Sequence, residues 1–141
     1  MFERVPVTTG YPESRRRVGC RSVLGLRIPV EAGRPVNLAV LRLTLSELGA
    51  AVGGGFPEGV LIAEYAGRGC VFYADARRVV RGLPVNERAV GLAARLGHHD
   101  RSVELRGDVL VLGCDGYLNE VGVPRPVVDA VAGSGLFGER A

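Results

Sequence analysis

The residue types best suited to catalysis or metal binding gather in the segment His98-His99-Asp100, which holds both histidines of the chain. Imidazole and carboxylate groups can hold a metal ion, or they can activate a nucleophile such as the thiol of Cys114. Adjacent residues rarely face the same ion, and no second group of Cys, His or Glu has the spacing of metal ligands. Cys114 ends an apolar run, where a small side chain is suited to packing. A triad assembled in space stays open, but we expect a solvated loop, a structural thiol, and neither a metal nor another cofactor.

Three consecutive glycines, Gly53-Gly54-Gly55, raise the question of phosphate binding. A phosphate-binding loop follows a strand, opens a helix and is completed by Lys and Ser or Thr. Here the glycines follow a helical pattern and precede Phe56-Pro57, and no such pair of residues comes after them. Glycine adopts left-handed backbone angles at little cost, which is typical of a helix C-terminus. We therefore expect a helix end and a turn at this place.

The N-terminal residues 1–23 carry the arginines best suited to contact phosphates: Arg15, Arg16, Arg17 and Arg21. Guanidinium groups on such a segment can neutralise nucleic-acid phosphates, and Tyr11 could stack on a base. The same segment also holds acidic residues, and a stretch of this composition can equally become ordered on a protein partner. The sequence therefore predicts a basic arm, flexible or loosely docked, with two alternative kinds of partner.

The segment RGLPVNERA, residues 81–89, combines a helix signal with side chains that could contact a partner. Pro84 disfavours helical angles before it, and Asn86 then stands at a preferred N-cap position with an acidic residue next to it. We interpret Asn86 as a cap and keep a surface role open for Asn86 and Arg88. Aromatic residues are frequent in binding hot spots, so three of them are further candidate partner contacts: Tyr73, Phe56 and Tyr117.

Apolar periodicity predicts the elements that must position these residues. A Thr-x-x-Glu pattern ending in glycine predicts a helix at 45–52, and glycine between two alternating runs predicts a hairpin with its turn at 66–68. Helical spacing predicts a helix at 85–97 that stops at Gly97, and a last helix over 124–132. The expected strands cover residues 24–30, 36–43, 59–65 and 69–75 and part of 103–116, followed by a short return strand. The apolar run from Val109 to Leu112 predicts that the strand within 103–116 is buried on both faces.

This order of elements predicts an α+β domain with a mainly antiparallel sheet of five to six strands and two to three short helices, because hairpins interrupt any regular βαβ alternation. The length of 141 residues suits one domain, assigned to 24–132, between the arm and a frayed tail at 133–141. Hydrophobic residues make up 47% and charged residues 23%, as in globular proteins. The net charge of +3 permits an acidic partner without requiring one. Neither a membrane span nor a signal peptide is indicated, so we expect a cytoplasmic protein.

Three short motifs follow one another in a characteristic order. They are Val52-Gly53-Gly54 after the first helix, Gly82-Leu83-Pro84-Val85-Asn86 after the hairpin, and the strand motif Gly107-Asp108-Val109-Leu110-Val111-Leu112-Gly113. In this order the chain resembles the uncharacterised family called domain of unknown function 3846, which occurs in phage, plasmid and bacterial genomes. The resemblance covers residues 24–131 and leaves the arm outside. It implies a small, compact intracellular protein, often of mobile-element origin and without a cofactor, and it implies no reaction.

Because no coherent catalytic constellation is present, we expect a non-enzymatic accessory or regulatory protein that acts by binding a protein partner. A phage- or plasmid-encoded inhibitor of a host system would fit this expectation, as would a virion component. The alternative is a nucleic-acid-binding module that uses the arginines of the arm. A small-molecule or nucleotide-binding enzyme ranks third. Edge strands could also pair between copies and form a homo-oligomer by sheet extension.

Overall fold

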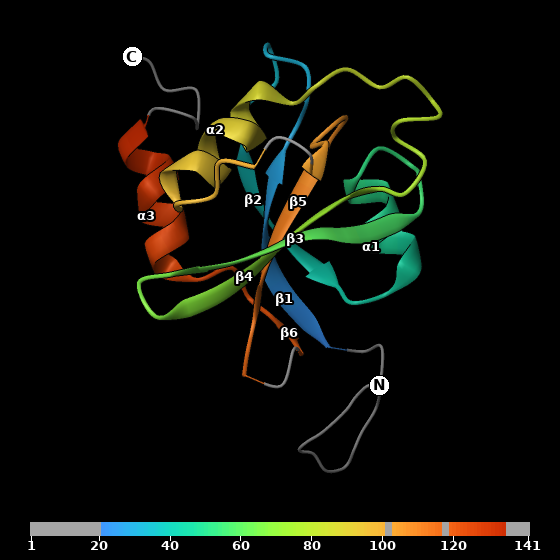
Figure 1. Cartoon of the computed structure of the whole chain (residues 1–141). Helices are drawn as coiled ribbons and strands as arrows, with labels where there is room; N and C mark the ends of the chain where they lie inside the picture. Colours follow the sequence, from blue (N-terminus) through green and yellow to red (C-terminus); the bar gives the residue numbers. More distant parts are fainter. Residues whose placement is uncertain (1–20, 101–102, 117–118, 135–141) are drawn as a thin grey trace.

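The computed structural model describes residues 21–100, 103–116 and 119–134, and they form a six-stranded sheet with three helices packed on it (Figure 1). The elements follow one another in the order β1 (Ser22–Ile28), β2 (Asn37–Arg42), α1 (Leu45–Ala51), β3 (Pro57–Tyr65), β4 (Arg68–Asp75), α2 (Glu87–Arg95), β5 (Val109–Cys114), β6 (Glu120–Val121) and α3 (Arg125–Ser134). Among the described helices, none is long and apolar enough to cross a membrane.

Strand β5 lies at the centre of the sheet. The strand order is β2-β1-β5-β4-β3, β6 pairs with β5 beside this path, and every pairing is antiparallel. β1 pairs with the first half of β5, where Leu26 lies opposite Val111, and β6 pairs with Gly113 and Cys114 at its end. The two hairpins β1–β2 and β3–β4 are therefore joined in the sheet by a strand that comes much later in the chain.

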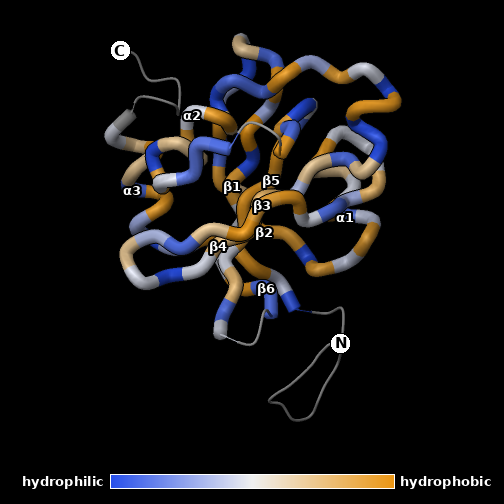
Figure 2. Tube along the Cα trace, viewed as in Figure 1, coloured by the Kyte–Doolittle hydropathy of each residue, from blue (hydrophilic) through white to orange (hydrophobic). Residues whose placement is uncertain are grey.

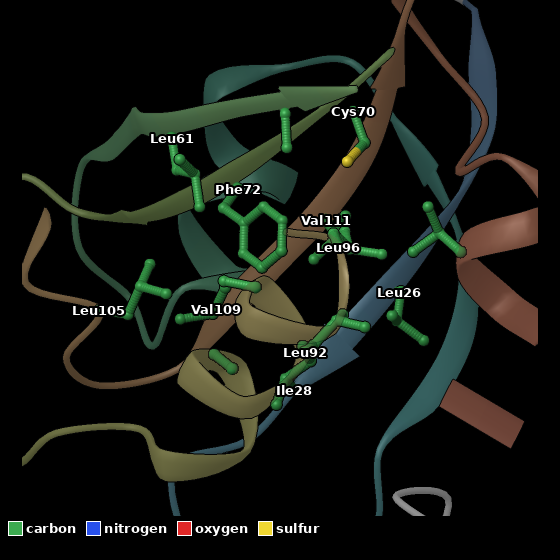
Figure 3. Packing of buried hydrophobic residues seen from close by; sticks show 14 of the residues in the cluster. Leu26, Ile28, Leu61, Cys70, Phe72, Leu92, Leu96, Leu105, Val109 and Val111 are labelled. Carbon is green, nitrogen blue, oxygen red and sulfur yellow. The ribbon is translucent and has the colours of Figure 1, made fainter. Parts of the chain in front are cut away.

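Side chains of β5 alternate between two hydrophobic cores, because successive residues of a strand point to opposite faces. Val109 and Val111 lie in the larger core, together with the buried sides of α2 and α3 (Figure 3). Leu110 and Leu112 lie in the smaller core, which α1 covers. Figure 2 shows the apolar residues gathered along the strands at the centre of the molecule. The prediction that this apolar run is buried on both faces is confirmed.

The predicted fold class is confirmed: the domain is α+β, with a mostly antiparallel sheet of six strands and three short helices. Element ends differ from the prediction by a few residues. β1 begins at Ser22, so two residues assigned to the arm pair with β2 instead. α3 extends to Ser134, two residues into the predicted tail, whose remaining residues lie outside the described part of the chain.

The β3–β4 hairpin has a shorter turn than predicted. Arg68 already pairs with Tyr65, so the turn consists of Ala66 and Gly67 alone instead of three residues. Their φ angles are 53° and 77°, and positive φ at both central residues is the property of a type I′ turn. Ala66 is unusual there, because a residue with a Cβ rarely adopts positive φ. Gly67 suits this turn, whereas Ala66 adopts its positive φ at an energetic cost.

Helix α1 begins and ends as its sequence predicts. The Thr44 hydroxyl accepts a hydrogen bond from the N–H of Glu47 at 3.1 Å, and the Glu47 carboxylate accepts one from the N–H of Arg42 at 2.9 Å. This is a variant of the capping box in which the carboxylate reaches beyond the N-cap residue. Gly53 and Gly54 follow the helix with φ of 90° and 89°. The glycine run therefore ends a helix, as predicted, and does not open one.

Candidate functional site

A surface pocket of about 410 Å³ lies between helix α2 and the segment that leads from it to β5, and we call it the α2 pocket. Its volume is within the range of about 300–1,000 Å³ that ligand sites occupy. The floor includes Leu61 and Leu105, which Figure 3 shows as part of the larger core. The other apolar lining residues are Val85, Val90, Ala93, Ala94 and Val103, and the polar ones are His98, His99, Asp100, Glu104 and Arg106.

Arg78, in the connector between β4 and α2, holds one wall of the α2 pocket in place. Its Nε donates to the carbonyl of Glu104 at 2.5 Å, and its Nη2 donates to the carbonyl of Val103 at 3.1 Å. Nη1 donates to the Glu58 carboxylate at 3.1 Å and to the carbonyl of Asp75 at 3.2 Å. The Arg78 side chain is 12% exposed, so water competes little for its bonds to the three carbonyls. A planar guanidinium reaches four acceptors at fixed angles, which an ammonium group cannot reproduce.

The connector that carries Arg78 is folded around the buried carboxylate of Asp75. The N–H of Arg77 donates to Oδ1 at 3.0 Å, and the guanidinium of Arg81 donates to Oδ2. Gly55 lies directly against this carboxylate, because a Cβ at Gly55 would come within 2.2 Å of the carboxyl carbon. Burial raises the pKa of Asp75, but the hydrogen bonds from the backbone and from Arg81 outweigh burial and lower the pKa below its ordinary value. An ionised Asp75 therefore orders the connector and positions Arg78.

Glu104 contributes to the α2 pocket from a strained backbone. Its φ of 61° is in the left-handed region, which costs a residue with a Cβ roughly 1 kcal/mol or more. The carbonyl is held by Arg78, and the carboxylate is held by the Nε of Arg106 at 2.5 Å. The hydrogen bond from Arg106 also lowers the pKa of Glu104, so this carboxyl is ionised at neutral pH. Such strain persists where the surroundings over-determine a conformation, and it is frequent at functional sites.

Asn86 caps α2 and also connects three parts of the fold beside the pocket. Its Oδ1 accepts from the N–H of Ala89 at 3.0 Å, which confirms the predicted cap. Its Nδ2 donates to the carbonyls of Ile28 and Gly107, each at 2.8 Å. The residue is fully buried, so the side chain has no exposed surface for a partner. The surface role that the sequence left open for Asn86 is therefore not supported, because its polar atoms bind the chain itself.

Arg88, the second residue of the opening turn of α2, also binds its own chain. Its Nη2 donates to the carbonyl of Pro29 at 2.6 Å and to the carbonyl of Glu31 at 2.9 Å. Burial lowers the pKa of the guanidinium. The side chain thus ties α2 to the turn between β1 and β2. A role in partner binding stays a prediction for this residue.

The aromatic candidates lie on the β3–β4 side of the sheet. Phe56 is 58% exposed, and Tyr73 is half-buried with its hydroxyl donating to Oε2 of Glu120 at 2.5 Å. Burial and this hydrogen bond raise the pKa of Tyr73. Neither residue lines the α2 pocket, and neither do Asn86 and Arg88. The structure therefore does not bring the described candidates together into one site.

The remaining candidates lie outside the described residues or at their edge. Tyr117 is outside them, and so are the arginines Arg15, Arg16 and Arg17. Arg21 is exposed just before β1, and its carbonyl accepts the N–H of Leu43 at 3.1 Å. Nucleic-acid binding by the basic arm therefore stays a prediction.

The cysteine and histidine candidates are separated in space. Cys114 ends β5 opposite Glu120 of β6, whereas His98 and His99 line the pocket beside α2, and Figure 1 shows α2 and β6 at opposite ends of the sheet. Burial raises the pKa of Cys114, and it raises the pKa of Cys70 to about 11. Both thiols are therefore poor nucleophiles at neutral pH. Within the described ranges, no group of three or more His, Cys, Asp or Glu residues could hold a metal ion.

Sequence reasoning found part of the α2 pocket and missed the rest. The segment with both histidines was predicted to be a loop, and His98 and His99 line the pocket. No sequence pattern pointed to Arg78, Glu104 or Arg106. Their arrangement depends on a contact between distant segments, in which the N–H of Asn86 donates to the carbonyl of Leu105 at 2.8 Å. No local sequence pattern predicts such a contact.

Comparison with known proteins gives a fold relationship. The solved structure "Crystal structure of small RNA methyltransferase HEN1" matches with a TM-score of 0.53 and 17% sequence identity, over 88% of this chain and 18% of that chain. At this identity the match shows the fold alone. No model of a known protein family matches the chain, and no curated protein matches it. The resemblance to domain of unknown function 3846 therefore stays a prediction.

Proposed function

We propose that this protein is a non-enzymatic binding protein that captures an apolar side chain of a protein partner in the α2 pocket. The observation that carries the proposal is a cavity of about 410 Å³ whose apolar floor is surrounded by polar lining residues. Binding hot spots pair an apolar anchor with such a pocket, and polar groups around it exclude water and fix orientation.

The chemistry of the lining favours a peptide over a small polar ligand. The buried part of the lining is apolar, with Leu61, Ala93 and Leu105 each less than a tenth exposed. His99 is exposed, where its imidazole can bond the backbone of an approaching chain. A Leu, Met or Phe side chain on an extended or helical partner segment fits this distribution of polarity.

Hydrogen bonds hold the pocket wall in place, so a partner can bind without a large rearrangement of the wall. Arg78 fixes the carbonyls of Val103 and Glu104, and Arg106 fixes the Glu104 carboxylate. Because this wall is already ordered, it loses little conformational entropy when a partner binds. The two thiols described above are removed from the pocket and have raised pKa values, so they offer no nucleophile to a bound molecule.

A pocket-filling substitution tests the proposal. Ala94 is half-buried and lines the pocket from α2, so Ala94→Phe places a ring in the cavity. Gly91→Phe is the matched control, because a Cβ at Gly91 on the same helix meets nothing within 4 Å. Peptides enriched from a random display library on the full-length protein serve as the probe, and fluorescence polarisation measures their affinity. We expect enriched peptides to share a large apolar residue and to bind Ala94→Phe at least about tenfold more weakly, while Gly91→Phe keeps wild-type affinity.

Equal affinity for the two phenylalanine variants would place binding elsewhere and contradict the proposal. Melting temperatures measured with a pool of nucleotides and metal ions address the third-ranked expectation of a nucleotide-binding enzyme. An upward shift of several degrees that Ala94→Phe abolishes would assign the pocket to a small molecule instead.

A further inference from the structure

The two edges of the sheet are built differently. The strand order makes β3 one edge and β2 the other, and an edge strand presents unpaired backbone groups that another strand can join. β3 begins with Pro57, carries the exposed residues Glu58 and Glu64, and has a register shift between Gly59 and Leu61. Proline, charge and irregularity are the devices by which natural proteins block edge pairing. The β3 edge is therefore protected.

The β2 edge lacks proline and irregularity, and its one charged residue, Arg42, stands at its end. The strand reads NLAVLR, without proline or an acidic residue, and it pairs with β1 through six consecutive residue pairs without a shift. One side of it is apolar and open, since Leu38 is 39% and Val40 is 71% exposed. Leu24 of β1 lies opposite Val40 and is itself 41% exposed, which extends the same surface. β2 is thus an edge strand of regular register whose central residues are apolar and uncharged.

The hydrogen-bonding phase of β2 shows which backbone groups face outward. Leu43 donates its N–H to the carbonyl of Arg21 on the β1 side, at 3.1 Å. Bonding direction alternates along an antiparallel strand, so the N–H and C=O groups of Leu38, Val40 and Arg42 point away from β1. The N–H of Arg42 confirms this phase, because it donates to Glu47 instead of β1. Leu38 and Val40 therefore present donors and acceptors at the edge, beside their exposed side chains.

We propose that the β2 edge pairs with β2 of a second copy of this chain, which extends the sheet across a two-fold axis. An antiparallel pair related by a two-fold axis must place one residue opposite its own copy. With Ala39 at the axis, Leu38 lies opposite the partner's Val40, and each of these two residues donates and accepts one bond. Arg42 then lies opposite the partner's Val36 at the end of the pairing, so no like charges face each other. The strand is self-complementary in hydrogen bonding, in side-chain polarity and in charge.

The oligomeric state of the full chain tests this proposal. Sedimentation equilibrium should give twice the chain mass of 14.9 kDa for the wild type. Val40→Lys should return the mass to 14.9 kDa, because it places like charges close to the axis. Ile62→Lys on β3 is the matched control, since Ile62 is 61% exposed, and this variant should keep the doubled mass. Leu38→Lys provides a second variant that should also halve the mass if Val40→Lys fails to fold.

Amide hydrogen exchange, followed by NMR, tests the pairing itself. In the wild type the N–H groups of Leu38 and Val40 should exchange slowly. In Leu38→Lys the N–H of Val40 should exchange rapidly, and in Val40→Lys the N–H of Leu38 should exchange rapidly. The N–H groups of Ala39 and Leu41 face β1 and should stay protected in all variants. A monomeric wild type, a dimer that Ile62→Lys dissociates, or a dimer with rapid exchange at Leu38 and Val40 would overturn the proposal.

Discussion

Asn86 offers the sharpest test of how the fold is held together beside the α2 pocket. Replacement by alanine removes one capping bond to Ala89 and two bonds to the carbonyls of Ile28 and Gly107, at 2.8–3.0 Å in a fully buried position. Loss of an N-cap costs about 1 kcal/mol. Each buried carbonyl left without its donor adds about 1 kcal/mol. We therefore expect Asn86→Ala to lower the free energy of unfolding by about 3 kcal/mol.

Urea unfolding followed by circular dichroism measures this loss, provided that the slope with urea concentration stays constant. Thr44→Ala is the matched control, because the Thr44 hydroxyl makes one capping bond to Glu47 in a part-buried position. We expect a loss of about 1 kcal/mol for Thr44→Ala. If Asn86→Ala costs no more than this control, the two carbonyl bonds contribute nothing and the reasoning is refuted.

Asn86→Asp separates the two roles of the amide. The carboxylate keeps an acceptor for the N–H of Ala89, but it loses both donors and faces two carbonyl oxygens in a buried site. Burial and these oxygens raise the pKa of the introduced carboxyl in the folded state above its unfolded value. The variant should therefore be less stable than Asn86→Ala at neutral pH, and it should gain stability as pH falls through the raised pKa. A stability gap between the two variants that does not change with pH would contradict this argument.

Three further predictions concern the turn and the buried carboxylate. Ala66→Asn should raise the free energy of unfolding by about 0.5–1 kcal/mol, because asparagine tolerates the positive φ of the type I′ turn better, and an unchanged urea midpoint would disprove it. Gly55→Ala should lower the free energy of unfolding by more than about 3 kcal/mol, because its Cβ would lie 2.2 Å from the carboxyl carbon of Asp75. Gly91→Ala is the control: a Cβ at Gly91 meets no atom within 4 Å, so this variant should be neutral or stabilising in the same assay. The pKa of Asp75 is lowered in the fold, so its ionisation stabilises the protein above its unfolded pKa of about 4, and this stabilisation is lost as pH falls through the folded pKa. The stability difference between the wild type and Asp75→Asn should accordingly shrink in acid, and a constant difference would exclude this role.

Local patterns predicted the elements well, because alternation, helical spacing and caps depend on neighbouring residues. The Thr44 cap, the helix end at Gly53 and the buried run of β5 were all visible in this way. Asn86 shows the limit: its position before a helix predicted the bond to Ala89, but not the bonds to β1 and to Gly107. The wall of the α2 pocket was missed for the same reason, since it depends on Arg78 reaching across the fold. Contacts between distant segments leave no periodic trace in one sequence.

The central place of β5 has a consequence for the order in which the protein can fold. Each hairpin, β1–β2 and β3–β4, forms from adjacent segments, but β1 and β4 acquire their second neighbours when β5 arrives from the last third of the chain. Pairings over such a distance slow folding, because the intervening chain must lose its freedom first. During synthesis β1 and β4 each keep one unpaired edge until β5 has been made, and unpaired edges are prone to wrong pairing. A chain truncated before Val109 should therefore aggregate rather than retain half of the fold, since both hairpins lose the strand that they share.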